Sequence, residues 1–209
     1  MIKFLKEWGI FLLIIVAIIL SRIFIWSLVI VDGHSMDPTL ADKERLAIVK
    51  TSSIDRFDIV VAKEETSTGD TKDIVKRVIG MPGDVIKFNN DKLTINNKVY
   101  SETYLNNFHK QLANGTLAET YGAYPLTNSL TEQNRNLFVS LAENTKAFTT
   151  DSTGNPSFTV TVPQGEYFLM GDNRVVSQDS RAVGTFKRSA IIGEAKLRIW
   201  PLNKISLLK

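Results

Sequence analysis

The sequence predicts a mainly β domain that follows a single N-terminal transmembrane helix. An apolar run extends from Trp8 to Val31 and is interrupted at Ser21 and Arg22, and about 20 apolar residues are enough to cross a bilayer. Beyond this run, short segments rich in Val and Ile are separated by turns that contain Pro, Gly and Asn. Short branched apolar segments bounded by turn residues are typical of β-strands.

The apolar run fits an uncleaved anchor better than a secretory signal peptide. A signal peptide would have its apolar core at residues 9–20, and the small residues of a cleavage site should follow. Instead, Ser21 and Arg22 are followed by more bulky apolar residues. The long stem of Arg22 would let its charge reach the outer lipid headgroups. Lys3 and Lys6 precede the run, so the positive-inside rule predicts a cytoplasmic N-terminus.

This topology divides the chain into three parts. Residues 1–7 are expected in the cytoplasm, residues 8–31 in the phospholipid bilayer, and residues 32–209 outside the cytoplasm. Within the outer part, residues 100–156 are polar, rich in Asn, Thr, Ser and Glu, and weakly periodic. We interpret them as a variable cap insertion on the β core, partly helical around residues 130–146.

Short apolar segments and their turns outline the β core. The strands expected on this basis are residues 45–50, 57–63, 73–80, 85–88, 92–96, 98–102, 157–162, 166–170 and 190–202. The sequence MPGD at residues 81–84 predicts a turn, because proline presets one φ angle and glycine accepts a positive one. Asparagine-rich pairs near residues 89–91 and 96–97 predict hairpin turns.

Composition excludes several classes of site. The chain has no cysteine, which removes disulfides, thiolate nucleophiles and cysteine-based metal sites. Its only histidines are His34 and His109, so a zinc site or a histidine-based triad would have to be built from these two. His109 lies in the polar insertion, where a surface or packing role is the simpler expectation. The net charge of +3 comes without a basic block, and we therefore expect no nucleic-acid partner.

The segment VDGHSMDPTL, residues 31–40, places a serine beside a histidine directly after the apolar run. A Ser-His-Asp hydrolase site is one interpretation. However, adjacent residues in an extended chain point to opposite faces, so His34 is badly placed to deprotonate Ser35. The other interpretation is an unactivated serine in a turn, and the segment alone favours it.

A lysine is the alternative base. A solvated lysine has a pKa of about 10.4 and cannot accept a proton near neutrality, but full burial in apolar surroundings can lower that pKa by up to about 3–5. In DIVKRVIGMPGD, Ile74 and Val78 share a strand face with Lys76, whereas the adjacent Arg77 stays protonated. Periodicity alone leaves two interpretations of Lys76 open, a buried base and one of a pair of strand-edge charges that reach solvent.

A third cluster, GDNRVVSQDSR at residues 171–181, follows the strand expected at residues 166–170. It combines aspartates, arginines, an asparagine and serines within one loop. In one interpretation it is a solvated turn whose surface ion pairs contribute little. In the other it is a network that positions another group, such as a hydroxyl that orients a neutral lysine.

With these motifs the sequence resembles the type I signal peptidases, membrane-anchored Ser/Lys endopeptidases that remove signal peptides from exported proteins. GHSMDPTL, RLAIVK, DIVKRVIGMPGD and GDNRVVSQDSR follow an N-terminal anchor in the family's order, and the closing GEAKLRIWPL also fits. One short motif would be weak evidence for this family, whereas four motifs in order after an anchor are specific to it. The resemblance spans most of residues 1–100 and 157–202 and implies a peptidase domain of coiled antiparallel β-sheets.

The resemblance implies that Ser35 is the nucleophile and Lys76 the general base. An acyl-enzyme would form on Ser35 and be hydrolysed by a water that Lys76 activates. The backbone N–H of Ser35 is implied as an oxyanion donor, and Met36 as part of the substrate site. Some members of the family carry a serine where this chain has Gly33, and its hydroxyl is a second oxyanion donor. A backbone group or a water would have to replace that hydroxyl here.

The third cluster supplies the supporting residues that the resemblance implies. Those that would orient the lysine or support its loop are Ser177, Asp179, Arg181, Asp172 and Arg174. Of these, Ser177 would hydrogen-bond to the Lys76 amine. The loop departs from the family at Val175-Val176, where many members have Asp and a polar residue. This departure leaves the nucleophile and the base unchanged, so activity is expected.

The resemblance also implies a class of substrate, and two rival functions remain open. Substrates would be pre-proteins in the same membrane with small residues at positions −1 and −3, because shallow apolar pockets reject larger side chains. No metal or organic cofactor is implied. One rival is a catalytically silent scaffold for surface structures, against which an intact Ser35 and Lys76 argue. The other is a self-cleaving regulator like the SOS repressors, which would need a DNA-binding region where this chain has the apolar run.

Overall fold

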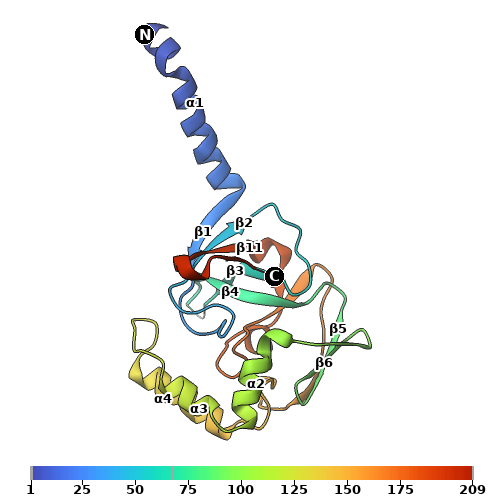
Figure 1. Cartoon of the computed structure of the whole chain (residues 1–209). Coiled ribbons are helices and arrows are strands. Elements are labelled where there is room, and N and C mark those ends of the chain that lie inside the picture. Colours follow the sequence, from blue (N-terminus) through green and yellow to red (C-terminus); the bar gives the residue numbers. More distant parts are fainter. Residues whose placement is uncertain (1, 67, 209) are drawn as a thin grey trace.

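The structure, a computed structural model, describes residues 2–66 and 68–208, with side chains described from Trp8 onward. The predicted membrane orientation depends on Lys3 and Lys6, whose side chains lie outside the described set. Met1, the first residue of the predicted cytoplasmic segment 1–7, also lies outside it. The first helix, α1 (Ile2–Phe24), projects away from the rest of the chain (Figure 1). Among the described residues, none of the helices combines the length and the hydropathy that a membrane span requires.

The N-terminal helix ends earlier than the predicted boundary at Val31. α1 stops at Phe24, and Trp26–Ile30 form strand β1, which pairs antiparallel with β2 (Arg45–Val49). The sequence did not mark this boundary, because an apolar run without alternation suits a helix and a buried strand equally well. The run predicted as one helix therefore contributes both a helix and the first strand of the core.

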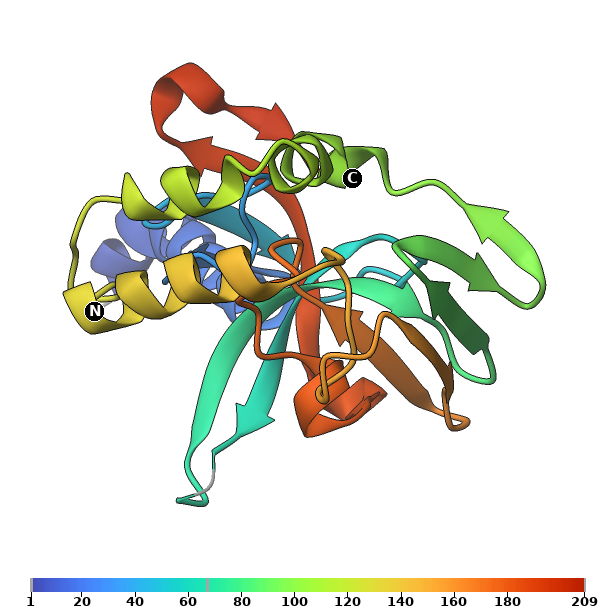
Figure 2. The same cartoon turned by 90° about the horizontal axis from the view of Figure 1, so that it is seen from below.

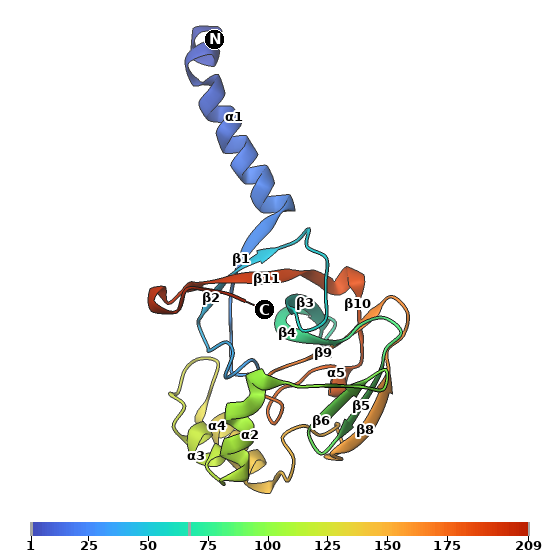
Figure 3. The ribbon, with the colours of Figure 1, turned by 45° about the vertical axis from the view of Figure 1, so that its right-hand side comes forward.

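Two antiparallel sheets form the core. Within the described residues the larger sheet has eight strands, in the order β1-β2-β11-β3-β4-β9-β10, with β12 paired to β11. The smaller sheet has the order β7-β6-β5-β8 and lies to one side of the larger one (Figure 3). The remaining strands are β3 (Ile59–Glu65), β4 (Thr71–Gly80), β5 (Val85–Asn89), β6 (Lys92–Ile95), β7 (Lys98–Tyr100), β8 (Ser157–Thr161), β9 (Glu166–Met170), β10 (Phe186–Lys187), β11 (Ile191–Trp200) and β12 (Ser206–Leu207). The mainly β prediction is confirmed, whereas β1, β10 and β12 were not predicted.

The predicted hairpin turns form as their residues require. Asn90 and Asp91 connect β5 to β6, and Asn96 and Asn97 connect β6 to β7, all four with positive φ. Two-residue hairpin turns that match the twist of their strands need positive φ at both positions, which asparagine and aspartate tolerate.

The insertion forms a helical cap, which we define as residues 103–148. It contains η1 (Thr103–Leu105), α2 (Asn106–Ala113), α3 (Leu117–Gly122) and α4 (Glu132–Asn144). The helix expected around residues 130–146 is α4, whereas α2 and α3 were not predicted. The cap helices gather at the end of the domain opposite α1 (Figures 1 and 2). After β9 the chain adds α5 (Ser180–Val183), η2 (Arg188–Ala190) and η3 (Leu202–Lys204).

Candidate active site

Ser35 lies in the loop between β1 and β2. The loop closes where the N–H of Lys43 donates a 2.8 Å hydrogen bond to the carbonyl of Val31. Met36 and Leu40 anchor it, because both side chains are fully buried in the apolar cluster of the larger sheet. Ser35 itself is half-buried, so the loop holds its side chain at the surface of the core.

Lys76 meets Ser35 from β4. The pairing of β4 with β3 places Lys76 opposite Val60, and the lysine side chain is almost entirely buried. Lys76 Nζ donates a hydrogen bond of 2.8 Å to Ser35 Oγ. Burial lowers the pKa of Lys76 to about 8, against the opposing attraction of Asp179 and Glu64. Of the two interpretations of Lys76, the structure supports the buried one.

A cleft of about 360 Å³ opens over this pair. One wall is β1 with Asp32, and the other is the outer half of β4, residues 72–76. β1 is the outermost strand of its sheet, and β4 pairs with β9 only from Arg77 onward. Within the described residues, two free strand edges therefore border the cleft. Met36, which the resemblance implied as part of the substrate site, also lines the cleft.

Gly33 takes a conformation that other residues avoid. Its φ is +89°, in the region where glycine carries no steric penalty. Its N–H donates a 2.7 Å hydrogen bond to Asp42 Oδ1 and is therefore already engaged. A Cβ at this position would meet nothing within 4 Å, so the backbone, and not space, disfavours a serine here.

Asn173 connects the loop of residues 171–181 to the loop that carries Ser35. Its N–H donates to the carbonyl of Ser35 at 3.0 Å, and its Nδ2 donates to the carbonyl of His34 at 3.1 Å. Its Oδ1 accepts a 2.5 Å hydrogen bond from the hydroxyl of Tyr121 in the cap. The contacts of Asn173 could not be predicted from the sequence, since a contact between such distant segments leaves no local signal.

Asp179 and Arg181 form a buried ion pair within the same loop. Asp179 is fully buried; it accepts a hydrogen bond from the N–H of Gly171 at 3.0 Å and two from Arg181 at 2.8 Å. Burial alone would raise the pKa of Asp179, but the hydrogen bonds and charge of Arg181, the charge of Lys76 and the N–H of Gly171 together outweigh it and hold the pKa below its usual range. Arg181 also donates to the carbonyl of Arg174 at 2.8 Å. The loop is therefore fixed from within.

Two more buried ion pairs attach the loop to its surroundings. Arg77 donates from Nε and Nη2 to the two carboxylate oxygens of Asp172, at 2.9 and 2.7 Å. Arg174 Nη2 donates to Glu102 Oε1 at 2.5 Å. Asp172 and Arg174 were predicted as loop supports, but their partners were not. One pair connects the loop to β4 and the other to the segment that leads into the cap.

Ser177 differs from its expected contact. Its Oγ is buried and has no hydrogen-bond partner among the described residues, so the predicted bond to the Lys76 amine is not formed. Ser177 nevertheless lies near the main chain of Ser35, because a methyl group at Gly171 would overlap both Ser177 Oγ and the carbonyl oxygen of Ser35. The absence of a side chain at position 171 allows this approach.

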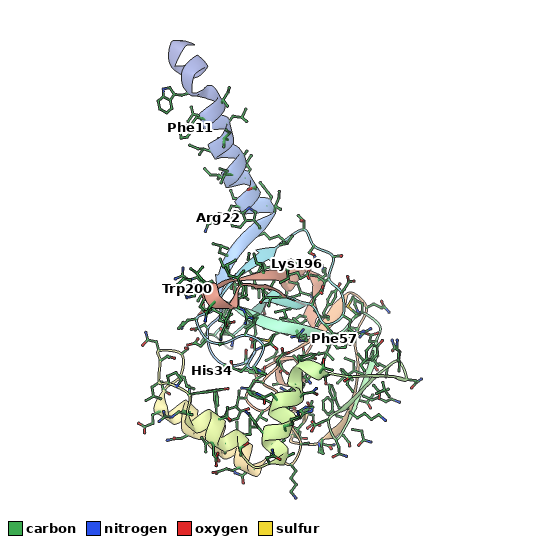
Figure 4. The ribbon with its side chains drawn as sticks, in the orientation of Figure 1. Phe11, Arg22, His34, Phe57, Lys196 and Trp200 are labelled. Atoms are coloured by element: carbon green, nitrogen blue, oxygen red, sulfur yellow. The ribbon has the colours of Figure 1, made fainter. Side chains whose placement is uncertain are left out.

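Neither histidine is placed to serve as the base. His34 Nδ1 lies 2.8 Å from Asp37 Oδ2, and its ring stacks on Tyr124 with 4.3 Å between ring centroids. Figure 4 shows His34 on the loop between β1 and β2, on the side of the cap helices. His109 packs edge-on against Phe148 within the cap. Among the described residues neither ring nitrogen of His34 is hydrogen-bonded to Ser35, which agrees with the expected orientation of adjacent residues, and His109 packs within the cap.

Comparison with known proteins assigns the family. The sequence model described as "Signal peptidase, peptidase S26" matches residues 5–200. This chain belongs to the signal peptidase family. It is accordingly a serine endopeptidase, and the family resemblance seen in the sequence motifs is confirmed.

Relatives within the signal peptidase family extend across the cap as well. Signal peptidase I of Streptococcus pneumoniae serotype 4 (strain ATCC BAA-334 / TIGR4) is 55% identical over 204 residues, which cover 97% of this chain and 96% of that protein. Signal peptidase IB of Staphylococcus aureus (strain Mu50 / ATCC 700699) is 34% identical over 178 residues, which cover 83% of this chain and 78% of that protein. The crystal structure of a signal peptidase I from Enterococcus faecalis V583 matches with a TM-score of 0.43 at 26% identity, over 68% of this chain and 97% of that one.

Proposed function

We propose that this chain is a signal peptidase I that removes N-terminal signal peptides from exported pre-proteins with a Ser35–Lys76 dyad. The observation that carries the proposal is the 2.8 Å hydrogen bond between Lys76 Nζ and Ser35 Oγ. With a pKa of about 8, an appreciable fraction of the lysine is neutral near neutral pH. When Lys76 is neutral, the Ser35 hydroxyl donates the hydrogen bond and the Lys76 amine accepts it, as general-base activation requires.

The reaction follows from this geometry. Lys76 accepts the hydroxyl proton while Ser35 Oγ bonds to the carbonyl carbon of residue −1. The proton then passes from Lys76 to the leaving amine as the C–N bond breaks, which leaves an ester on Ser35. A water that Lys76 deprotonates hydrolyses this ester and restores the serine. The N–H of Ser35 is the oxyanion donor in this scheme, and Gly33 does not supply a second one, because its N–H is bound to Asp42.

The substrate would bind as an extended strand between β1 and β4. An extended peptide can add to a free sheet edge through its main chain, with alternate side chains facing the same way. Residues −1 and −3 would then both face the floor of the cleft, where apolar residues such as Val31 and Ile74 contribute to the lining. A shallow apolar floor accepts small side chains at both positions and rejects larger ones.

The supporting loop would orient the base during turnover. We assign Ser177 to hydrogen-bond the Lys76 amine once the amine is neutral, with Asp179 and Arg181 keeping the loop in place. The support for this is that Ser177 Oγ is buried without a partner and lies against Gly171, beside the main chain of Ser35. Asp172 and Arg174 hold the same loop through their ion pairs.

We further propose that α1 anchors the enzyme in a phospholipid bilayer, with residues 1–7 in the cytoplasm and the catalytic domain, from β1 onward, outside it. Support comes from Lys3 and Lys6 ahead of the apolar run and from exposed apolar side chains on α1, such as Ile10 and Leu13. Protease added to intact, wall-stripped cells should digest the domain. Digestion only after lysis would reverse the orientation.

Cleavage of a purified pre-protein tests the central assignment. The wild-type chain should remove the signal peptide, and Ser35→Ala should not, with an unchanged unfolding midpoint. Ser152→Ala, at an exposed position, is the matched control and should retain full activity. Cleavage by Ser35→Ala in a preparation free of host peptidase would refute the nucleophile. A folded wild-type chain that cleaves no pre-protein would instead support the silent-scaffold alternative.

A further inference from the structure

The cap and the nucleophile share a set of buried hydrogen-bonding groups. We call Gly33, His34 and Ser35 the nucleophile turn. The N–H of Gly33 donates to Asp42 Oδ1 at 2.7 Å. Asp42 Oδ2 in turn accepts hydrogen bonds from two cap hydroxyls, Ser129 at 2.9 Å and Thr127 at 3.4 Å. The Asp42 carboxylate therefore connects the first residue of the turn to the loop between α3 and α4.

The other two residues of the turn have similar connections. His34 stacks on Tyr124 of the cap. The carbonyls of His34 and Ser35 both accept hydrogen bonds from Asn173. Asn173 Oδ1 in turn accepts a hydrogen bond from the Tyr121 hydroxyl. Each residue of the turn is thus held either by the cap directly or by a side chain that the cap also binds.

Burial makes these connections effective. Asn173 and Tyr121 have no solvent exposure, and the side chains of Asp42 and His34 are each less than a tenth exposed. Hydrogen bonds in such surroundings compete little with water and are costly to break. Gly33 is also the residue with the greatest backbone freedom in the turn. Without external contacts, the orientation of the Ser35 N–H and Oγ would therefore be weakly determined.

We propose that the cap is a positioning element of the catalytic centre, with Asp42 and Asn173 as the positioning residues through which Ser129, Thr127 and Tyr121 hold the nucleophile turn. The proposal rests on Ser35 being the nucleophile. The cap touches neither Ser35 Oγ nor Lys76 Nζ through any hydrogen bond within the described residues. Its contribution is to orient the attacking oxygen and the oxyanion donor, where small displacements have large effects on rate.

The proposal predicts a specific kinetic pattern. The double variant Thr127→Val/Ser129→Ala removes both hydroxyls on Asp42 while keeping the size of the cap loop. Its kcat should fall about 10-fold, with KM changed by less than about twofold and with the acid limb of the pH profile unmoved, because Lys76 keeps its surroundings. Tyr121→Phe, which removes only the hydroxyl on Asn173, should behave in the same way.

Two further measurements separate positioning from general support of the fold. A peptide aldehyde with the sequence of a signal peptide up to residue −1 forms a hemiacetal with Ser35 and so needs the oriented turn. Its affinity should fall by the same factor as kcat. Restoring one hydroxyl, in Thr127→Val/Ser129→Thr, should recover kcat. Thr120→Val is the matched control, since that hydroxyl bonds within α3 to the carbonyl of Thr116 at 3.3 Å.

The outcomes are distinct from those of the proposed function. If the hydroxyl variants keep wild-type kcat and aldehyde affinity, whatever their unfolding midpoint, the cap only packs on the domain and the proposal is wrong. A loss equal to that of the Thr120→Val control would refute it as well. Activity in Ser35→Ala, by contrast, would refute the assignment of Ser35 as the nucleophile, whatever the cap variants show.

Discussion

Arg77 and Asp172 form a doubly hydrogen-bonded ion pair that solvent does not reach. The two hydrogen bonds are 2.9 and 2.7 Å long, and the side chains are at most 2% exposed. Arg77 follows Lys76 on β4, whereas Asp172 begins the loop that touches the carbonyl of Ser35. The pair therefore joins the strand that carries Lys76 to the loop that contacts the main chain of Ser35. Arg77 also donates to the carbonyl of Phe57 at 2.8 Å.

Breaking this pair should destabilise the whole domain. Asp172→Asn leaves the Arg77 guanidinium buried with a neutral partner, and removing one member of a buried pair costs about 3–5 kcal/mol. Urea unfolding should show a correspondingly lower midpoint with an unchanged slope. Lys43→Gln, which removes an exposed lysine from a surface ion pair, is the control and should leave the midpoint unchanged. A stable Asp172→Asn domain would show that the pair is dispensable.

Gly171 should not tolerate even a methyl group. Alanine there would overlap Ser177 Oγ and the carbonyl oxygen of Ser35, so the loop must move away from the nucleophile turn. We expect Gly171→Ala to reduce kcat by about 10²-fold, the effect of a displacement of about 1 Å at a reacting group. Gly122→Ala in α3, where the added Cβ would lie 3.8 Å from Val139, is the control. Equal activity of the two variants would contradict the close packing of the loop.

Ser177→Ala should affect stability and activity in opposite directions. The Ser177 hydroxyl is buried without a partner, which costs free energy, so its removal should leave the unfolding midpoint unchanged or raise it. If the hydroxyl orients the neutral lysine, kcat/KM should nevertheless fall about 10-fold. Wild-type kcat/KM in Ser177→Ala would remove this residue from the proposed mechanism.

Much of the β core could be predicted from the sequence, because local alternation marks a strand wherever turn residues bound it. The strands at β2 to β9 and at β11 lie close to their predicted ranges. β1 could not be recognised, since its residues continue the apolar run of α1. The helices α2 and α3 are short and polar, and helices of this length depend on tertiary packing more than on their own sequence.

The candidate site also contains residues that could be predicted from the sequence and residues that could not. The order of the motifs predicted that Ser35 and Lys76 belong to one site. The local sequence pattern alone left an alternative for each residue: an unactivated serine in a turn, and a strand-edge lysine that reaches solvent. The roles of Asn173 and Asp42 could not be predicted, because both depend on segments of the cap that the fold brings to the nucleophile turn. Contacts between such distant segments have no periodicity from which to infer them.

Glu64→Gln should move the pH profile in a defined direction. Glu64 faces Lys72 across β3 and β4, and its negative charge raises the pKa of Lys76. Without this charge the pKa of Lys76 falls further, so the acid limb of kcat/KM should shift to lower pH. Glu65→Gln, at the adjacent exposed position, is the control and should leave the limb in place. An acid limb that does not move in Glu64→Gln would show that this carboxylate does not act on Lys76.

The pH dependence of kcat/KM, compared between wild type and Lys76→Arg, tests the central claim most directly. Burial lowers the pKa of Lys76 to about 8, so kcat/KM of the wild type should rise with pH as the ammonium loses its proton and reach half its plateau near that value. Lys76→Arg keeps the charge but cannot give up a proton in this range, and its kcat/KM should be at least about 10³-fold lower at every pH. Near-normal turnover by Lys76→Arg, or a wild-type rate that rises only near the pKa of a solvated lysine, about 10.4, would contradict the dyad.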